Sequence, residues 1–451
     1  MLLRRFLYRH FRGVSSLKFW LHRRVTQGGW LALVGLGTSA LLGLDTQQTV
    51  AYQLFTFMAA LLALSLGCSL RFRGRFAVSR VLPRFGSVGE PLAYRIIVRN
   101  ETAAPQRGLM LFENVLDPRP SFEEFVQTPE PGEEGRNWFD RHVGYYRWAW
   151  LISRHQGATL REQAIPALPP REPLEVRVEI LPSRRGYLRL SGVTLARPDP
   201  FGLFRSCLTV PAPASLLVLP RRYPLPRLRL PGTRKYQRGG VALTSSVGES
   251  EEFVALRDYR PGDPLRRIHW RSWPKVGKLV VKEYQDEFFV RHALVLDTFA
   301  GPAQQEMFEE AVSVAASFAC AIETQESLLD LMFIGPEAYC VTAGRGLGHP
   351  DRMLEILACV RVCQDRPFHA LRQLVLERHQ ALSGCICVLL GWDAARQQFI
   401  HELRGLGIQT LVLVIVEAAP GDVAAPGPGQ DGAEGFHRLE VGKIAEGLAR
   451  L

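Results

Sequence analysis

Residues 248–287 read GESEEFVALRDYRPGDPLRRIHWRSWPKVGKLVVKEYQDE, and they separate two parts of the chain that have different residue patterns. The stretch holds eight Arg and Lys side chains and two tryptophans. Its centre, Arg260-Pro261-Gly262-Asp263, predicts a type II turn, because Pro261 presets φ at the second position and Gly262 supplies the positive φ required at the third. Charged residues on both sides of the turn predict a network of ion pairs. We therefore interpret the stretch as a joint.

The net charge of +11 comes from one end of the chain. Residues 1–80 hold eleven Lys and Arg and one acid, Asp45, whereas the rest of the chain holds 44 basic and 43 acidic side chains. A nucleic-acid interface needs a basic patch with aromatic side chains between the cations. No such patch is left outside the N-terminal region, so we expect no nucleic-acid partner. A length of 451 residues predicts two or three soluble units.

Two uncharged apolar segments, residues 28–44 and 50–70, lie within the basic region. As helices they would be about 26 and 32 Å long, close to the ~30 Å of a hydrocarbon core. We expect a transmembrane hairpin in the lipid bilayer, preceded by a basic cytoplasmic N-terminus, residues 1–27. A cleaved signal peptide is the alternative for the first segment, but no clear Ala-x-Ala site follows it. Because Arg and Lys flank both ends of the hairpin, the soluble domains are predicted to lie in the cytoplasm.

Residues 76–220 alternate apolar and polar positions in the manner of antiparallel strands. The strand pattern is clearest in four segments: Pro91–Arg99, Leu109–Val115, Leu174–Leu181 and Tyr187–Leu195. We expect an immunoglobulin-like β-sandwich. The segment Asp199-Pro200-Phe201-Gly202-Leu203-Phe204 ends it with a turn that should pin the chain back onto the core. Residues 221–247 are expected to be a linker.

An insertion, residues 116–170, interrupts the predicted sandwich. It is rich in Pro, Glu and aromatic residues and lacks a regular period. We expect it to cover the sheet. The alternative is a binding surface lined by its aromatic side chains, Trp138, Tyr145, Tyr146, Trp148 and Trp150.

After the joint, residues 288–451 alternate strands and helices. Apolar strands are expected at 291–299, 328–334, 385–390 and 409–416, and amphipathic helices at 304–325, 351–363, 371–382 and 394–406. A short strand and helix between 436 and 450 should close the domain. Continuous apolar strands that alternate with helices favour a mostly parallel sheet covered on both faces, an α/β doubly wound domain.

Two carboxylates follow strands of this predicted sheet, where ligands of open α/β sheets bind. Asp297 ends the first strand and Asp393 follows the strand at 385–390, and paired carboxylates suit Mg²⁺. At this point the domain resembles the von Willebrand factor type A fold, whose metal site begins with Asp-x-Ser-x-Ser. Phe299 and Gly301 stand at the two hydroxyl positions. The resemblance thus implies the fold and a degenerate metal site, with Asp297 and Asp393 as candidate ligands.

Catalytic signatures are sparse elsewhere. The sequence has no GxxxxGK[ST] loop, no HExxH and no GxSxG. His269 lies among three arginines, which disfavour its protonated form, and no Ser or Cys nucleophile is evident beside it. We interpret His269 as a structural histidine, with a general base as the alternative, and predict no cofactor. The eight cysteines show no CxxC repeat and are interpreted as reduced thiols, mostly buried.

The joint also carries a family resemblance. Its residues Glu252-Phe253, Leu256-Arg257, Tyr259-Arg260-Pro261-Gly262-Asp263, Arg266, Ile268 and Trp270 resemble the signature of the bacterial family called domain of unknown function 58. The run at 199–203 and the two apolar segments extend the resemblance over nearly the whole chain. Ser272-Trp273-Pro274-Lys275 departs from the small pair and arginine that often follow the tryptophan in that family.

The resemblance implies a protein of the bacterial inner membrane with a type A-like last domain. It also implies two partners encoded nearby, a MoxR-type AAA+ ATPase and a transglutaminase-like membrane protein, and hence a role in assembly or maturation of envelope components. We expect a membrane-anchored adaptor in which Arg257, Arg260, Asp263 and Arg266 fix the joint or contact the partner. The alternative is an enzyme of unknown reaction that uses the motif itself, with His269 and Asp263 as acid and base.

Overall fold

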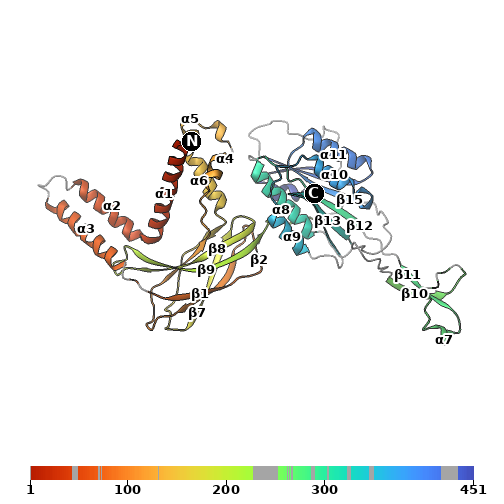
Figure 1. Cartoon of the computed structure of the whole chain (residues 1–451), viewed down its shortest axis with the longest axis horizontal. Coiled ribbons are helices and arrows are strands. Elements are labelled where there is room, and N and C mark those ends of the chain that lie inside the picture. The colour runs from red at the N-terminus through yellow and green to blue at the C-terminus, as the bar shows by residue number, and fades with distance from the viewer. Residues whose placement is uncertain are drawn as a thin grey trace. The chain divides into compact units, whose positions relative to one another are not determined.

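The computed structural model describes residues 2–42, 49–69, 72, 74–130, 132–226, 252–261, 263, 265, 268–285, 290–301, 304–321, 327–344, 350–417 and 435–451. The chain divides into two compact units, Met1–Arg221 and Arg222–Leu451. The first combines helices with two β-sheets, and the second combines a β-hairpin with a six-stranded sheet and its helices (Figure 1). The protein is therefore multidomain and of mixed α and β structure, as the sequence predicts.

Three helices begin the first unit: α1 (Leu2–Arg24), α2 (Gln27–Leu42) and α3 (Thr49–Ser69). The basic N-terminus, for which no element was predicted, forms α1. Helices α2 and α3 pack together and cover most of the two predicted spans. Within the described residues, Val50–Ser69 is the one helical segment long and apolar enough to cross a membrane, while α2 is apolar but has 16 residues. Two membrane spans stay a prediction.

The turn at Asp199 joins these helices to the strands. The buried Asp199 carboxylate accepts hydrogen bonds from the backbone N–H of Leu203 and Phe204, both at 3.0 Å, and from the Ser65 hydroxyl of α3. At the start of α2, the Thr26 N–H donates to the Leu203 carbonyl at 3.0 Å. A Cβ added to Gly29 would lie 2.1 Å from the same carbonyl oxygen, so only glycine allows this approach. The sequence predicted the turn but not its helical partners.

Two sheets follow, and they pack face to face. One has the order β1-β3-β7-β5 and the other β2-β9-β8-β4-β6. Their bounds are β1 (Phe76–Val81), β2 (Phe85–Ser87), β3 (Leu92–Asn100), β4 (Met110–Val115), β5 (Ala158–Leu160), β6 (Gln163–Ala164), β7 (Pro173–Pro182), β8 (Gly186–Pro198) and β9 (Arg205–Leu219). Alternate residues of each sheet, such as Ile96 of β3 and Leu216 of β9, form a shared core. The predicted strands lie where the alternation placed them.

The first part of the insertion is largely helical and packs on α1, whereas β5 and β6 in its second part are edge strands of the two sheets. It contains α4 (Phe122–Gln127), a 3-10 turn (Glu133–Gly135), α5 (Trp138–Val143) and α6 (Tyr145–His155), followed by β5 and β6. Its buried Trp148 and Phe125 form a separate apolar cluster with Tyr8 of α1. We expected the insertion to cover the sheet, but this cluster is built against α1. Of the aromatic residues proposed for a binding surface, Trp148 is buried and Trp138, Tyr145 and Tyr146 are exposed.

The second unit ends in a six-stranded sheet of order β14-β13-β12-β15-β16-β17. Its strands are β12 (Val290–Leu296), β13 (Ser327–Ile334), β14 (Ala338–Ala343), β15 (Gly384–Leu389), β16 (Gln409–Val416) and β17 (Phe436–Glu440). All neighbours are parallel except β13 and β14, which are antiparallel. Counted from β12 this is the doubly wound order 3-2-1-4-5-6, with its switch point between β12 and β15.

Helices cover both faces of this sheet. They are α8 (Gln305–Ala321), α9 (Pro350–Cys359), α10 (His369–Leu376), α11 (Ala394–Gly405) and α12 (Ile444–Leu448). On one face, Ala293 and Val295 of β12 pack with residues of α10 and α11. The alternate residues Leu294 and Leu296 are also fully buried, and α8 contacts the strands from that side. Burial on both faces of the sheet is the physical reason for the continuous apolar runs in the sequence.

The first residues of the expected linker are fixed to α8. The Tyr223 hydroxyl donates to Glu310 at 2.6 Å, and the Tyr223 N–H donates to the Ser317 hydroxyl at 2.8 Å. The remainder of the expected linker, residues 227–247, lies outside the described residues.

Candidate functional site

The stretch that carries the family resemblance, which we call the motif, forms a β-hairpin. Strand β10 (Glu252–Asp258) pairs in antiparallel fashion with β11 (Val280–Gln285), and the long connection between them carries the predicted turn (Figure 1). Ile268 forms a bridge with Val281, and the His269 N–H donates to the Val280 carbonyl at 2.8 Å. Ile268 and Val281 are buried. The connection therefore folds back on β11 instead of extending as a free loop.

An ion pair fixes the turn. The Asp263 carboxylate receives two hydrogen bonds from the Arg257 guanidinium, at 2.7 and 2.8 Å. It also accepts the backbone N–H of Arg260 at 2.9 Å, and the Asp263 N–H donates to the Arg260 carbonyl at 3.0 Å, which closes the turn. The Arg257 side chain and the Arg260 N–H lower the pKa of Asp263 to about 2. Asp263 is therefore ionised at neutral pH, which suits an ion pair and does not suit a general acid.

The other predicted motif residues are distributed around this pair. Tyr259 is half-buried, and its N–H donates to the Leu279 carbonyl at 2.9 Å, which extends the ladder between the strands. Arg260 and Pro261 are exposed. Gly262 and Arg266 lie outside the described residues, so the turn type and the role of Arg266 stay predictions.

A serine lies beside His269 that the sequence interpretation missed. The His269 Nδ1 and the Ser272 hydroxyl are 2.5 Å apart, within a turn closed by the Ser272 N–H and the His269 carbonyl at 3.0 Å. The statement that no hydroxyl nucleophile lies beside His269 was wrong. The signal in the sequence was the spacing of three residues between His269 and Ser272, which a tight turn can bring into contact. Within the described residues, no carboxylate forms an ion pair with His269, so the third group of a triad is not found there.

Two tryptophans next to this turn are exposed. Trp270 and Trp273, which begins the short helix α7 (Trp273–Val276), lie edge to face with ring centroids 5.9 Å apart. Their exposed fractions are 55% and 48%. Large aromatic side chains supply much of the binding energy of protein interfaces when they become buried in a partner. We call Trp270 and Trp273 the tryptophan pair.

The carboxylates proposed as degenerate metal ligands share an arginine. At the switch point of the sheet, Arg396 of α11 donates from Nε to the fully buried Asp297 at 2.7 Å and from Nη1 to Asp393 at 2.5 Å. Asp297 also accepts the backbone N–H groups of Phe299 at 2.9 Å and Leu390 at 3.0 Å. A guanidinium cation thus occupies the position between the two carboxylates.

The electrostatics of this cluster follow from burial and charge. Burial raises the pKa of Asp297, and Arg396 with the two backbone donors opposes that shift. Burial lowers the pKa of Arg396, but the two carboxylates outweigh it, so that its pKa is raised. Asp393 is also the N-cap of α11, accepting the Arg396 N–H at 2.9 Å. The sequence placed both carboxylates at one sheet edge but did not identify Arg396 as their partner.

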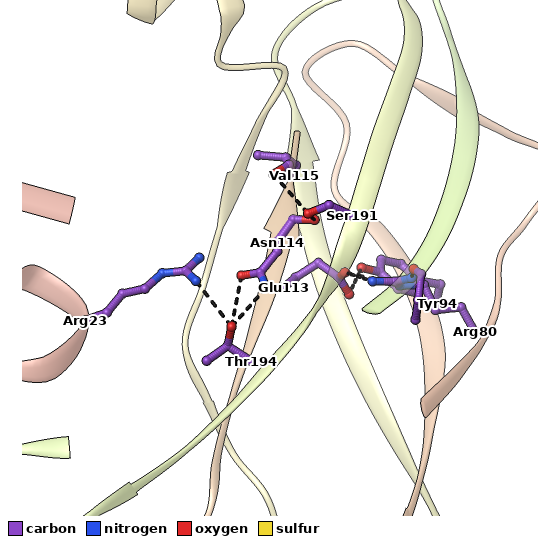
Figure 2. Close-up of polar contacts among 9 residues, drawn as sticks. Arg23, Arg80, Tyr94, Glu113, Asn114, Val115, Ser191 and Thr194 are labelled. Atoms are coloured by element: carbon purple, nitrogen blue, oxygen red, sulfur yellow. Dashed lines mark hydrogen bonds and ion pairs between the residues drawn. The ribbon is translucent and has the colours of Figure 1, made fainter. Parts of the chain in front are cut away.

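A second buried ion pair lies between the two sheets of the first unit (Figure 2). Glu113 of β4 accepts from the Arg80 guanidinium of β1 and, at 2.7 Å, from the Tyr94 hydroxyl of β3. Burial is the largest cause of a raised pKa of Tyr94, and the Glu113 carboxylate adds to it. Tyr94 therefore stays a neutral donor. The charges are satisfied within the protein, so the group clamps the sheets together and presents no reactive atom to solvent.

On the outer face of the second sheet, a further polar group meets α1. Thr194 of β8 bonds to Asn114 of β4 at 2.9 Å and accepts from Arg23 of α1 at 3.3 Å (Figure 2). Burial lowers the pKa of Arg23. The contact places the end of α1 on the sandwich.

Within the described residues, no group of three or more His, Cys, Asp or Glu side chains is placed to hold a metal ion. Of the eight cysteines, two are exposed, three are partly buried and only three are buried: Cys363, Cys385 and Cys387. The prediction of mostly buried thiols was therefore too strong.

No family model matches the chain. Over 126 residues it is 29% identical to "Uncharacterized protein YeaD" of Bacillus subtilis (strain 168), a match that covers 28% of this chain and 31% of that protein. Among solved structures, the CARDB domain of the PF1109 protein from Pyrococcus furiosus, in complex with di-metal ions, is 12% identical, with 32% of this chain and 89% of that chain covered and a TM-score of 0.17. A beta-glucosidase from Listeria innocua in complex with glucose is 13% identical, with 32% and 16% covered and a TM-score of 0.17. At these TM-scores, neither structural likeness supports a conclusion about fold or function.

Proposed function

We propose that this protein is a membrane-anchored adaptor of the domain of unknown function 58 family. In this proposal it works with a MoxR-type AAA+ ATPase, and with a transglutaminase-like membrane protein, in assembly or maturation of envelope-associated complexes. The hairpin α2–α3 spans the bacterial inner membrane twice, and both soluble units lie in the cytoplasm. The two-sheet unit is an immunoglobulin-like sandwich, and the doubly wound unit is a von Willebrand factor type A-like domain.

The observation that carries the proposal is the exposed tryptophan pair on the motif hairpin. Trp270 and Trp273 expose about half of their surface, although aromatic side chains are stabilised by burial. The turn beside them is closed by the Ser272 N–H on the His269 carbonyl and tied to β11 by the His269 N–H on the Val280 carbonyl, so the aromatic surface is already ordered before a partner binds. Pre-organised aromatic anchors are typical of protein-binding surfaces.

The chemistry of the neighbouring residues suggests the character of the partner surface. Arg271, between the two tryptophans, and the following Lys275 and Lys278 are exposed cations. An apolar pocket with an acidic rim would fit such a surface, because opposite charges steer association and favour the correct partner. We assign that surface to the ATPase.

The experiment is affinity capture of the full-length protein from detergent-solubilised membranes of its source bacterium. We expect recovery of a MoxR-type ATPase, identified by mass spectrometry, and a different yield with ATP and with ADP. Trp270→Ala combined with Trp273→Ala should reduce the yield strongly. The matched control is Tyr187→Ala, which removes a side chain that is 63% exposed on β8 of the first unit. Absence of the ATPase with both nucleotides would count against the adaptor.

The enzyme alternative is favoured by one observation, the 2.5 Å contact between His269 Nδ1 and the Ser272 hydroxyl. A histidine in hydrogen-bond contact with a serine is the pair that activates a hydroxyl nucleophile. If the motif is catalytic, His269→Ala and Ser272→Ala should each abolish complementation of a deletion strain while the fold and the capture of the ATPase are preserved. If both variants complement normally, the contact only closes the turn.

A further inference from the structure

Helix α1 has an apolar stripe that no described residue covers. Leu3, Phe6, Val14, Leu17 and Trp20 are between 45% and 66% exposed. At 3.6 residues per turn their side chains fall within an arc of about 120° on one side of the helix. We call these five residues the α1 stripe. Isolated exposed apolar residues are ordinary, whereas five on one side of a helix along about five turns, interrupted only by His10, mark a surface that is covered in the working protein.

The opposite side of α1 is fixed to the rest of the unit, so the α1 stripe cannot turn inward. The Tyr8 hydroxyl donates to the Pro120 carbonyl at 3.1 Å, and Trp148 Nε1 donates to the Ser15 hydroxyl at 2.9 Å. Phe11 packs against the same cluster of α4 and α6. Helices α4 and α6 of the insertion therefore support α1 and hold its apolar stripe on the side that faces away from them.

Charge and position identify the surface that covers the stripe. Helix α1 contains seven Arg and Lys and no Asp or Glu. On a helical projection Arg9 and Lys18 border the stripe on its two sides. A long helix with an apolar face bordered by cations, rich in Phe, Leu and Trp, is suited to the headgroup layer of an anionic bilayer.

Helix α1 also adjoins the apolar hairpin in the sequence. Only Val25 and Thr26 separate α1 from α2. In Figure 1, α1 runs across the direction of α2 and α3, while α4 and α6 lie on the side of α1 away from the hairpin. If the hairpin crosses a bilayer, α1 in this arrangement lies along the membrane surface.

We propose that α1 is an interfacial helix, with the α1 stripe among the upper acyl chains of anionic phospholipids and its basic side chains on their phosphates. The inference rests on the proposed membrane anchoring. Because Arg23 and the contacts with α4 and α6 fix α1 to the sandwich, the helix would set the orientation of the sandwich relative to the bilayer. The insertion then acts as the support of this contact.

The test uses full-length protein in nanodiscs that contain phosphatidylglycerol and phosphatidylethanolamine. The photo-reactive residue benzoylphenylalanine is placed at position 17 in one variant and at position 19 in another. Phe19 is a suitable control, because it is 58% exposed, as Leu17 is at 57%, but lies on the opposite side of α1 beside Arg23. We expect lipid adducts at position 17 and a much lower yield of them at position 19. The yield at position 17 should decrease when Arg9→Gln and Lys18→Gln are introduced.

Equal adduct yields at positions 17 and 19, or adducts at position 17 that contain protein instead of lipid, would overturn the inference. Incorporation of the protein into nanodiscs reports separately on the hairpin. Protein that enters nanodiscs without lipid adducts at position 17 would refute the interfacial helix and leave the anchor intact. Protein that does not enter nanodiscs would refute both.

Discussion

The arginine between Asp297 and Asp393 offers the sharpest test of the ion-pair interpretation of this edge of the six-stranded sheet. Arg396→Met keeps much of the side-chain length but removes the cation. Asp297 would then be a fully buried carboxylate with two backbone donors and no countercharge. Removing one partner of a buried ion pair typically costs about 3–5 kcal/mol. We expect a loss of stability of that size at neutral pH.

The pH dependence of the loss has a defined sign. Without Arg396 nothing cationic opposes the burial that raises the pKa of Asp297. A carboxyl group whose pKa is raised by folding loses stability as the pH rises above its unfolded value of about 3.9, by about 1.4 kcal/mol per pH unit until the folded pKa is reached. The deficit of Arg396→Met should therefore be smaller at pH 5 than at pH 8. Adding Asp297→Asn should recover most of it, because no buried charge remains.

Hydrogen exchange of the full-length protein, followed by mass spectrometry of peptides from β12 and β15, measures the local loss of stability in Arg396→Met. A loss of about 3 kcal/mol corresponds to exchange roughly 150-fold faster. The control is Asp393→Asn, which removes the outer carboxylate, 56% exposed, and keeps a capping oxygen. It should cost less than about 1 kcal/mol. Unchanged exchange in Arg396→Met, or slower exchange of the wild type with millimolar Mg²⁺, would refute the reasoning.

Three further expectations concern other parts of the chain. Glu113→Ala strands a buried guanidinium and should destabilise the sandwich by about 3–5 kcal/mol, seen as faster hydrogen exchange in β3 and β4; exchange at the wild-type rate would mean that the clamp is not needed. Asp263 should titrate near pH 2 by NMR, so its ion pair contributes stability above a pH of about 4 and loses it as the pH falls through 2; a titration near pH 4 would contradict the pair. Gly29→Ala brings a Cβ against the Leu203 carbonyl and should speed exchange in the 199–204 turn, whereas Gly37→Ala, with open space around its Cβ position, should not.

Much of the fold could be predicted because it depends on local periodicity. Strands such as Leu92–Asn100 alternate with a period of two because one face is buried, and residues 293–296 of β12 are continuously apolar because helices cover both faces of the sheet. The turn around Pro261 and the edge position of Asp297 also follow from short-range rules. These features need only neighbouring residues.

The partners of the candidate residues could not be predicted in the same way. Asp297 meets Arg396 across 99 residues, Tyr8 meets Trp148 across 140, and Asp199 meets Ser65 across 134. No period in the sequence encodes such pairs. Even the contact of His269 with Ser272, only three residues away, depends on a turn whose conformation is fixed by β11.

The sequence by itself determined the order of basic N-terminal region, apolar segments, strands and α/β unit, because composition and periodicity report charge and burial directly. The tertiary structure decided which distant residues contact one another and which side chains stay exposed. It places the Arg396 guanidinium between the two carboxylates for which a metal was considered, and it packs the insertion against α1 as a support. It also leaves Trp270 and Trp273 exposed on an ordered turn. The physical reason is that charge compensation and the covering of an apolar face depend on which distant segments meet, and only the packed chain specifies that.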